Sequence, residues 1–344
     1  MKIWEFVVKV ANPYFSFPDD IQRLPEDLLS YAAEFAVKNK VFPLFYEGCR
    51  KLGIHLNQKA DVLISEFERR RRAQLEASKL LLEIGERYGL ELLFFKTFRP
   101  FNYVPDDIDI LLRHRNDLEL LVSLLGDKGY KLLKIGSPEV VVRKIWNGMY
   151  VDIDIHTSIA AGHLLLLKTE NLWRSSTYKA VGDGYKIPVL SEHYEVVREV
   201  AYSLLKDFMI SVPGFYCAIN AVIKENLYAA RRIAEEENLL PHVDLFLEVA
   251  HSIAYELFGS EAKPFPYERR NTSTVPLKLI RGDLRRRLRV PYPFPAFVVA
   301  LAYLSKVRAE IQKDGNLEAL LQLLKQPSSK GMDILLNYIR ERLH

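Results

Sequence analysis

Two short stretches of the chain alternate aspartate with aliphatic residues, and their aspartates are the residues best suited to chemistry. Asp107 and Asp109 lie in DIDILLR, and Asp152 and Asp154 lie in VDIDIH. Residues i and i+2 of a β-strand project from the same face, so each pair places two carboxylates about 6–7 Å apart. If the two strands are neighbours, the carboxylates converge into an oxygen-rich site for a hard cation such as Mg²⁺ or Mn²⁺.

Two such ions would activate a hydroxyl nucleophile and stabilise a leaving pyrophosphate. The alternative interpretation is two ordinary strands with solvated acidic faces. Aspartate is depleted in strands, and four aspartates in the same phase on two strands therefore favour the metal site.

The elements that position these aspartates follow from hydrophobic periodicity and from the glycines and prolines. The pattern up to residue 90 is helical, with helices expected at 24–40, 42–53 and 60–89. It then becomes β-like, with strands expected at 91–96, 107–113, 130–136, 140–146 and 149–156 and one helix at 116–129. Asn147-Gly148 predicts a two-residue hairpin turn between the last two strands. We therefore expect an α+β fold, in which a small mixed sheet has helical cover.

The pattern from residue 191 onward is helical again. Helices are expected at 191–208, 213–240, 242–259 and 293–313, with two shorter helices at the end and a loop at 262–276. We expect an N-terminal helical region packed on the core, the core itself, and a mostly α-helical C-terminal domain, with bounds at 1–90, 91–190 and 191–344.

Composition excludes several classes of protein. The chain has 344 residues, of which 49% are apolar, enough to bury real cores. It has neither a membrane-length apolar run nor a signal-peptide pattern, so we expect no membrane partner and a cytoplasmic location. Cys49 and Cys217 lie far apart and form no disulfide framework or zinc pair. The glycine-rich phosphate loops and the serine-hydrolase motif are absent, and high charge with few Gly, Met and Cys is typical of a thermophile.

Charge distribution favours a phosphate-rich ligand. The formal net charge is only +4, but short arginine runs occur at 69–72, 269–270 and 285–287. Each run alone is better interpreted as a solvated helix face. Together with a sequence pI near 8.8, the runs favour a polyanion such as RNA.

The residues around the first acidic strand complete a longer pattern. FFKT at 94–97 is followed, in order along the chain, by DIDILL, KGYK, VDIDIH, NLWRSS and VLSEHYEVV. This order resembles the DNA-polymerase-β-like nucleotidyltransferases, and within them the uncharacterised archaeal and bacterial nucleotidyltransferases with a Lys-Gly, Asp-x-Asp and Asp-x-His pattern. The resemblance covers roughly residues 27–210 and makes the core at 91–190 the catalytic part.

The resemblance implies an enzyme that transfers NMP from an NTP to an acceptor hydroxyl with two Mg²⁺ or Mn²⁺ ions. It makes Asp107 and Asp109 the ligands of both metals. Asp154 or Asp152 would bind the catalytic metal and help to deprotonate the acceptor. Asp154 is favoured because, with His156, it matches the Asp-x-His of the family.

Lys96-Thr97 departs from the pattern, since the superfamily has Gly-Ser here and the closer relatives have Lys-Gly. Thr97 can supply the hydroxyl, while Lys96 and Arg99 can supply cations for phosphate, and Arg113 is a further candidate. The missing glycine removes the close approach of the backbone to a triphosphate. Either Arg143 or Lys144 faces the site, because the two alternate on the neighbouring strand.

Three functions remain open from the sequence. The first is an active nucleotidyltransferase whose acceptor is RNA, a small hydroxylated molecule or a protein, with RNA favoured. The second is a module on the same fold that binds nucleotide or RNA without turnover. The third is a divalent-metal phosphohydrolase that uses water as the nucleophile.

Overall fold

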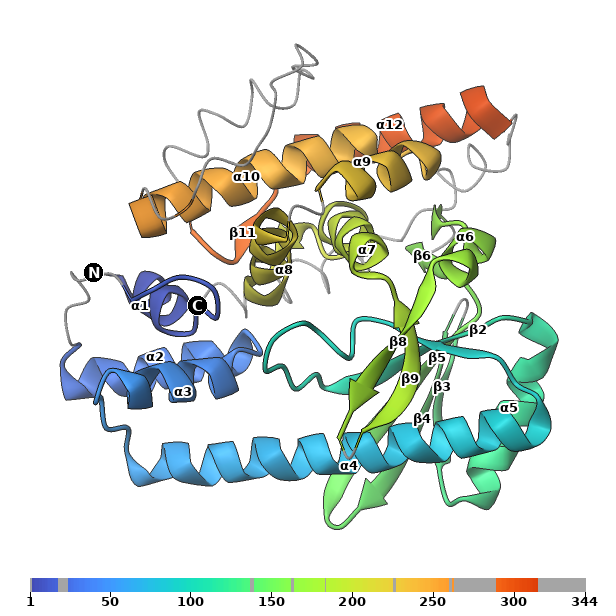
Figure 1. The fold of residues 1–344 in the computed structure, drawn as a ribbon, viewed down its shortest axis with the longest axis horizontal. Coiled ribbons are helices and arrows are strands. Elements are labelled where there is room, and N and C mark those ends of the chain that lie inside the picture. Colours follow the sequence, from blue (N-terminus) through green and yellow to red (C-terminus); the bar gives the residue numbers. More distant parts are fainter. Residues whose placement is uncertain are drawn as a thin grey trace. The chain divides into compact units, whose positions relative to one another are not determined.

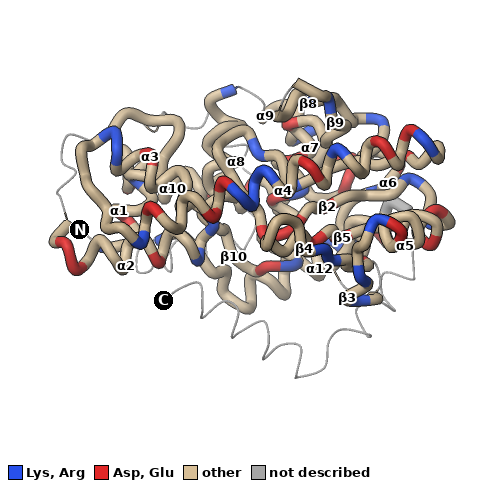
Figure 2. The backbone as a smooth tube through the Cα atoms, turned by 90° about the horizontal axis from the view of Figure 1, so that it is seen from below, with Lys and Arg blue, Asp and Glu red and all other residues tan. Residues whose placement is uncertain are grey.

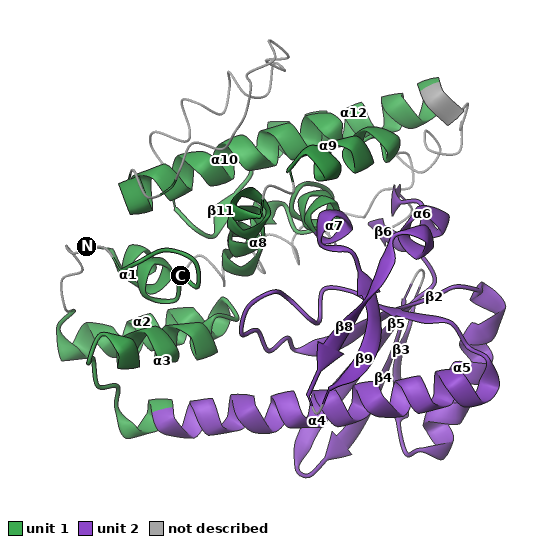
Figure 3. Cartoon of the chain, viewed as in Figure 1, with its two compact units in different colours: residues 1–60, 196–344 green, residues 61–195 purple. Residues whose placement is uncertain are grey.

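The computed structural model describes residues 2–17, 24–136, 139–161, 164–182, 184–224, 227–259, 262 and 289–314. The chain divides into two compact units, one of residues 61–195 and one of residues 1–60 with 196–344 (Figure 3). The two predicted helices at the end of the chain, the arginine runs at 269–270 and 285–287, and the loop predicted at 262–276 beyond Ala262 lie outside the described residues.

The unit of residues 61–195 is built on a seven-stranded mixed sheet with the strand order β3-β4-β5-β2-β1-β9-β8 (Figure 1). Its strands are β1 (Leu92–Phe94), β2 (Asp107–Leu112), β3 (Lys131–Ile135), β4 (Glu139–Trp146), β5 (Met149–His156), β8 (Ser176–Val181) and β9 (Tyr185–Leu190). Two neighbouring pairs, β2 with β5 and β1 with β9, are parallel. The other neighbours are antiparallel. The expected mixed sheet with helical cover, and with it the α+β class, is confirmed.

Two helices cover one face of this sheet. They are α4 (Gln58–Tyr88) and α5 (Leu118–Asp127), the latter preceded by the short 3₁₀ helix η1 (Arg115–Asp117). The hydrophobic core between helices and sheet contains Ala77, Leu81 and Leu121 from the helices, and Ile108, Ile110, Leu112, Val151, Ile153 and Ile155 from β2 and β5. Because side chains alternate along a strand, Asp107, Asp109, Asp152 and Asp154 project from the opposite face.

The remaining elements of this unit are short. A two-stranded sheet pairs β6 (Ile159–Ala161) with β7 (Leu164–Leu167), and α6 (Thr169–Arg174) follows. The hairpin predicted at Asn147-Gly148 is present, with φ of 47° and 78°, as a turn of two left-handed residues requires.

The apolar pattern does not predict strands β8 and β9, which extend the sheet beyond β1. Most β8 side chains are exposed, so no alternation marks it. Pro188 lies within β9, and a proline inside a segment argues against predicting a strand there.

The described part of the second unit is almost entirely helical. It contains α1 (Ile3–Val10), α2 (Glu26–Lys38), α3 (Phe42–Lys51), most of α7 (Glu192–Leu205), α8 (Val212–Ile223), α9 (Leu227–Glu236), α10 (Leu240–Phe258), α12 (Ala296–Asp314) and the paired strands β10 (Met209–Ile210) and β11 (Tyr292–Pro293). The single helix predicted at 213–240 is two helices, α8 and α9, because α8 ends at Ile223 with Lys224 as its C-cap. None of the helices in the described part of the chain is long and apolar enough to cross a membrane.

The two units differ from the three expected domains. Almost all of α4 belongs with the sheet, because its apolar side chains form the sheet's core. The helices before it group with the C-terminal helices instead. The hydroxyl of Tyr216 in α8, for example, donates to the backbone carbonyl of Val8 in α1 at 2.9 Å.

Candidate metal centre

The parallel pairing of β2 with β5 brings the two acidic stretches together. In this register Asp107 lies beside Asp152, and Asp109 lies beside Asp154. Both pairs project from the sheet face that α4 and α5 leave uncovered. The sequence predicts each pair separately, and the register turns them into one acidic surface.

Three residues of this surface form a cluster that can hold a metal ion. Ligand atoms of Asp109, Asp154 and His156 all lie within 4.8 Å of one another. Asp109 and His156 are each only 2% exposed, while Asp154 is partly exposed. Nε2 of His156 lies 3.3 Å from Oδ1 of Asp109, and the ring of Phe95 packs edge-on against the imidazole at 5.0 Å between centroids. Asp154 is therefore the member of the cluster that is most accessible to solvent.

Lys96 supplies positive charge to this cluster. Its ammonium lies 3.1 Å from Oδ2 of Asp109 and 3.9 Å from Oδ1 of Asp107. Lys96 follows β1 with φ of 62°, and the N–H of Thr97 donates to the carbonyl of Phe95 at 2.6 Å across it. A left-handed conformation at a residue other than glycine costs about 1–2 kcal/mol, and such strain concentrates at functional sites.

The carboxylates of the cluster differ in protonation. Burial alone would raise the pKa of Asp109, but Lys96 and His156 together hold it well below its usual range. Asp154 behaves oppositely: burial, followed by the charges of Asp107 and Asp109, raises its pKa to about 7. The negative charge at Asp154 is thus not fully compensated by the protein, and a bound cation would compensate it.

Thr97 and Arg99 are buried in the structure. The Thr97 hydroxyl accepts the backbone N–H of Asp109 at 2.9 Å and donates to the carbonyl of Phe95 at 3.2 Å. It therefore joins the loop after β1 to β2. The guanidinium of Arg99 stacks on the ring of Tyr103 at 4.8 Å.

Asp152 has a different environment from Asp154. Arg143 on β4 donates two hydrogen bonds of 2.6 Å to its carboxylate oxygens. Of the two alternating cations on that strand, Arg143 thus lies on the acidic face. Lys144 lies on the other face, where its ammonium donates to the carbonyl of Lys128 at 2.7 Å.

The loop between β1 and β2 is fixed from elements distant in sequence. From α4, Gln74 donates to the carbonyl of Pro105 at 2.8 Å, and Arg71 donates to the side chain of Asn102 at 3.1 Å. From β8, the ammonium of Lys179 donates to the carbonyls of Phe98 and Arg99 at 3.0 and 2.7 Å. Sequence reasoning missed Gln74 and Lys179, since no local pattern marks a residue that supports a loop some 30 or 80 positions away.

The arginine run at 69–72 lies on α4, where basic and acidic residues are interspersed (Figure 2). Arg69 and Arg70 pair with acidic residues, Glu66 at 4.0 Å and Asp106 at 3.5 Å. Part of this run therefore supports the helix and the loop. Arg113, at the far end of β2, pairs with Glu91 at 2.6 Å.

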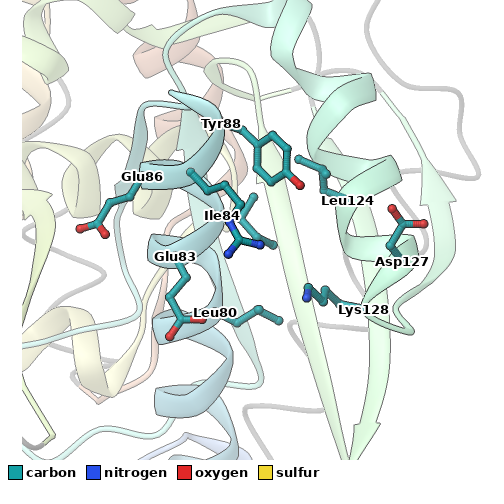
Figure 4. A pocket seen from close by; sticks show the side chains of 9 residues that line it. Leu80, Glu83, Ile84, Glu86, Tyr88, Leu124, Asp127 and Lys128 are labelled. Carbon is teal, nitrogen blue, oxygen red and sulfur yellow. The ribbon is translucent and has the colours of Figure 1, made fainter.

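Two surface grooves of this unit are separate from the acidic cluster. One, of about 640 Å³, lies between α4 and α5, and its lining includes Leu80, Glu83, Tyr88, Leu124, Asp127 and Lys128 (Figure 4). The other, of about 490 Å³, is lined by Arg113, His114, Thr169, Glu170, Trp173 and Arg174. Neither is lined by a predicted metal ligand.

No family model matches the sequence, and no curated protein matches it.

Proposed function

We propose that this chain is a metal-dependent nucleotidyltransferase that transfers NMP from an NTP to an acceptor hydroxyl. The observation that carries the proposal is the parallel register of β2 and β5, which aligns Asp107 and Asp109 with Asp152 and Asp154 on one face of the sheet. Paired carboxylates on adjacent strands are the arrangement that in-line transfer of a phosphoryl group needs to hold divalent ions.

The residues present fit a divalent cation. Asp109 and Asp154 offer carboxylate oxygens, the donors that Mg²⁺ and Mn²⁺ prefer. Burial, followed by the charges of Asp107 and Asp109, raises the pKa of Asp154 to about 7, and a nearby cation favours the ionised form of such a carboxyl. Asp107 completes the set that would hold two ions. When bound, such ions neutralise phosphate charge and activate the attacking hydroxyl.

The protein's own groups have separate tasks in this proposal. Asp154, the partly exposed carboxylate of the cluster, accepts the proton of the acceptor hydroxyl as general base. His156 orients the buried Asp109, 3.3 Å away. Lys96, beside Asp107 and Asp109, supplies a cation for the phosphates of the nucleotide.

A second candidate function is a module that binds nucleotide without turnover. The loop after β1 favours it, because Lys96 has a left-handed φ where glycine would let the backbone approach a triphosphate. The Thr97 hydroxyl, moreover, already bridges the N–H of Asp109 and the carbonyl of Phe95.

The deciding experiment incubates the protein with each NTP, labelled at its α-phosphate, in the presence of Mg²⁺ or Mn²⁺ and bulk RNA. Label on RNA with release of pyrophosphate, lost in Asp109→Asn and kept in the control Asp127→Asn, exposed on α5, supports transfer. Nucleotide binding without turnover supports the second candidate. Release of free NMP without a labelled acceptor would instead identify a phosphohydrolase.

A further inference from the structure

We propose that the open sheet face beside the acidic cluster binds the acceptor, and that this acceptor is the end of a single-stranded polynucleotide. The surface, here called the acceptor strip, consists of Lys131 on β3, Arg143 and Ile145 on β4, and Tyr150 on β5. The inference rests on the proposed function, since it names the substrate class of the same site.

Strand register places the acceptor strip next to the carboxylates. Lys131 pairs with Arg143, Arg143 with Asp152, and Asp152 with Asp107, so these residues form one row across four strands. Ile145 pairs with Tyr150 in a further row of the same face. Val142, Val151 and Ile153, which alternate with these residues along the strands, are buried in the core under the helices. Because side chains alternate between the two faces of a strand, the acceptor strip lies on the face away from the helices.

The chemistry of the acceptor strip suits stacked bases and phosphates. Ile145 and Tyr150 are 61% and 59% exposed, so an apolar and an aromatic side chain are accessible on the same face as Arg143 and the aspartates. The guanidinium of Arg143 lies 4.9 Å from the centre of the Tyr150 ring. An aromatic platform flanked by cations is the arrangement that binds single-stranded nucleic acid, with bases stacked on rings and the backbone along the positive charges.

The length of the acceptor strip favours a polymer over a small acceptor. Tyr150 and Asp154 lie on one face of β5, four positions apart, which corresponds to about 13 Å along the strand. A ligand stacked on Tyr150 must span this distance, past Arg143, to present a hydroxyl to Asp154. An extended oligonucleotide spans it with a base at one end, phosphates in the middle and a terminal hydroxyl at the other.

Arg143 is suited to the middle position. Its Nε and Nη2 form a bidentate pair with Asp152 at 2.6 Å. A planar guanidinium also binds phosphate through two parallel hydrogen bonds. Lys131, in the same row and exposed, adds a second positive charge. The row therefore offers cations toward the β3 edge and carboxylates toward β2, which gives a polyanion one preferred direction on the sheet.

The test measures binding of a fluorescein-labelled single-stranded RNA by anisotropy, without nucleotide or metal. Arg143→Gln and Tyr150→Ala are each expected to weaken binding about 5- to 20-fold, and Arg143→Lys is expected to lose less. Matched controls are Lys144→Gln, the neighbour on the opposite face of β4, and Tyr88→Ala, 47% exposed on α4, which covers the opposite face of the sheet. Both controls are expected to bind within about twofold of the wild type, and thermal melting checks that every variant folds.

Equal losses in the control variants, or unchanged binding in Arg143→Gln and Tyr150→Ala, would overturn the assignment of the surface. Duplex RNA that binds as tightly as single-stranded RNA would overturn the ligand class, because a stacking platform needs unpaired bases. Neither result contradicts the proposed function, which is tested separately by transfer of label from NTP in the wild-type protein. Conversely, transfer retained in Asp109→Asn would refute the function while the anisotropy data still decide the role of the acceptor strip.

Discussion

The ammonium of Lys96 lies 3.1 Å from Oδ2 and 3.3 Å from Oδ1 of Asp109, so the most buried carboxylate of the cluster has a cation of the protein itself beside it. A divalent ion bound at Asp109, Asp154 and His156 would have to share Asp109 with that ammonium. Lys96 thus stabilises the metal-free site and opposes the metal.

Lys96→Gln is therefore expected to bind Mn²⁺ about tenfold more tightly than the wild type, because a repelling charge a few ångströms from the metal is removed. The same variant should melt at a lower temperature without metal and recover when Mn²⁺ is added. Titration calorimetry and melting curves measure the two effects. Lys79→Gln, exposed on α4, is the control and should change neither, whereas weaker Mn²⁺ binding by Lys96→Gln would contradict the competition.

The left-handed backbone at Lys96, with φ of 62°, predicts that glycine at this position is more stable than alanine. This is the reverse of their usual order in helices and strands. Lys96→Ala and Lys96→Gly both lose the ammonium and differ only in the strain of the turn. Glycine should be the more stable of the two by about 1 kcal/mol in urea unfolding, since it adopts positive φ without strain. An alanine variant of equal or greater stability would show that the turn is not left-handed in solution.

The Thr97 hydroxyl is expected to be structural. Thr97→Val keeps the shape but leaves the buried N–H of Asp109 without its acceptor, which should cost about 1–3 kcal/mol of unfolding free energy. Thr97→Ser retains the hydroxyl and serves as the control. Urea unfolding of the three proteins compares these values, and a valine variant as stable as the serine variant would argue against the bridge.

Asp154 and Asp152 should differ in their importance for transfer. Asp154 belongs to the metal cluster, whereas Asp152 is engaged by Arg143. Asp154→Asn is expected to lower the rate of label transfer by 10²-fold or more, on the order of the loss of a general base, and Asp152→Asn by much less. A larger loss in Asp152→Asn would reverse the assignment.

His242 in α10 predicts a dependence of stability on pH. Burial, followed by the nearby charge of Lys306, lowers its pKa from 6.5 to about 4, and a ring nitrogen lies 2.8 Å from the carbonyl of Ala302. Above pH 6.5 the imidazole is neutral in both states and contributes no pH dependence. Between pH 6.5 and 4 only the unfolded chain takes up the proton, so the unfolding free energy falls as the pH falls, by at most about 3 kcal/mol.

This contribution is measured as the difference in pH dependence between the wild type and His242→Asn. The exposed His55 supplies the control, since His55→Asn should retain the wild-type slope. A His242→Asn protein whose stability falls with acid as steeply as that of the wild type would rule out His242 as the source.

The order and period of the strands near the site could be predicted from sequence because they depend on local rules. Alternation at Asp107 and Asp109 marks one strand, and the Asn147-Gly148 turn places β4 antiparallel to β5. The resemblance stated for the sequence added the expectation that the two acidic strands act together. Strands β8 and β9 could not be predicted in the same way. Most side chains of β8 are exposed, so β8 lacks the alternation of apolar and polar residues, and β9 contains Pro188.

By itself, the sequence determined which residues can share a strand face, since that follows from a period of two along the backbone. Only the tertiary structure decided which faces meet. The parallel register of β2 with β5 set Asp109 beside Asp154, and the antiparallel register of β4 with β5 placed Arg143 on Asp152 and turned Lys144 away. The turn after β1 brought Lys96 to Asp109. The physical reason is that register and the direction of a buried cation depend on contacts between residues far apart in the chain, which no local pattern encodes.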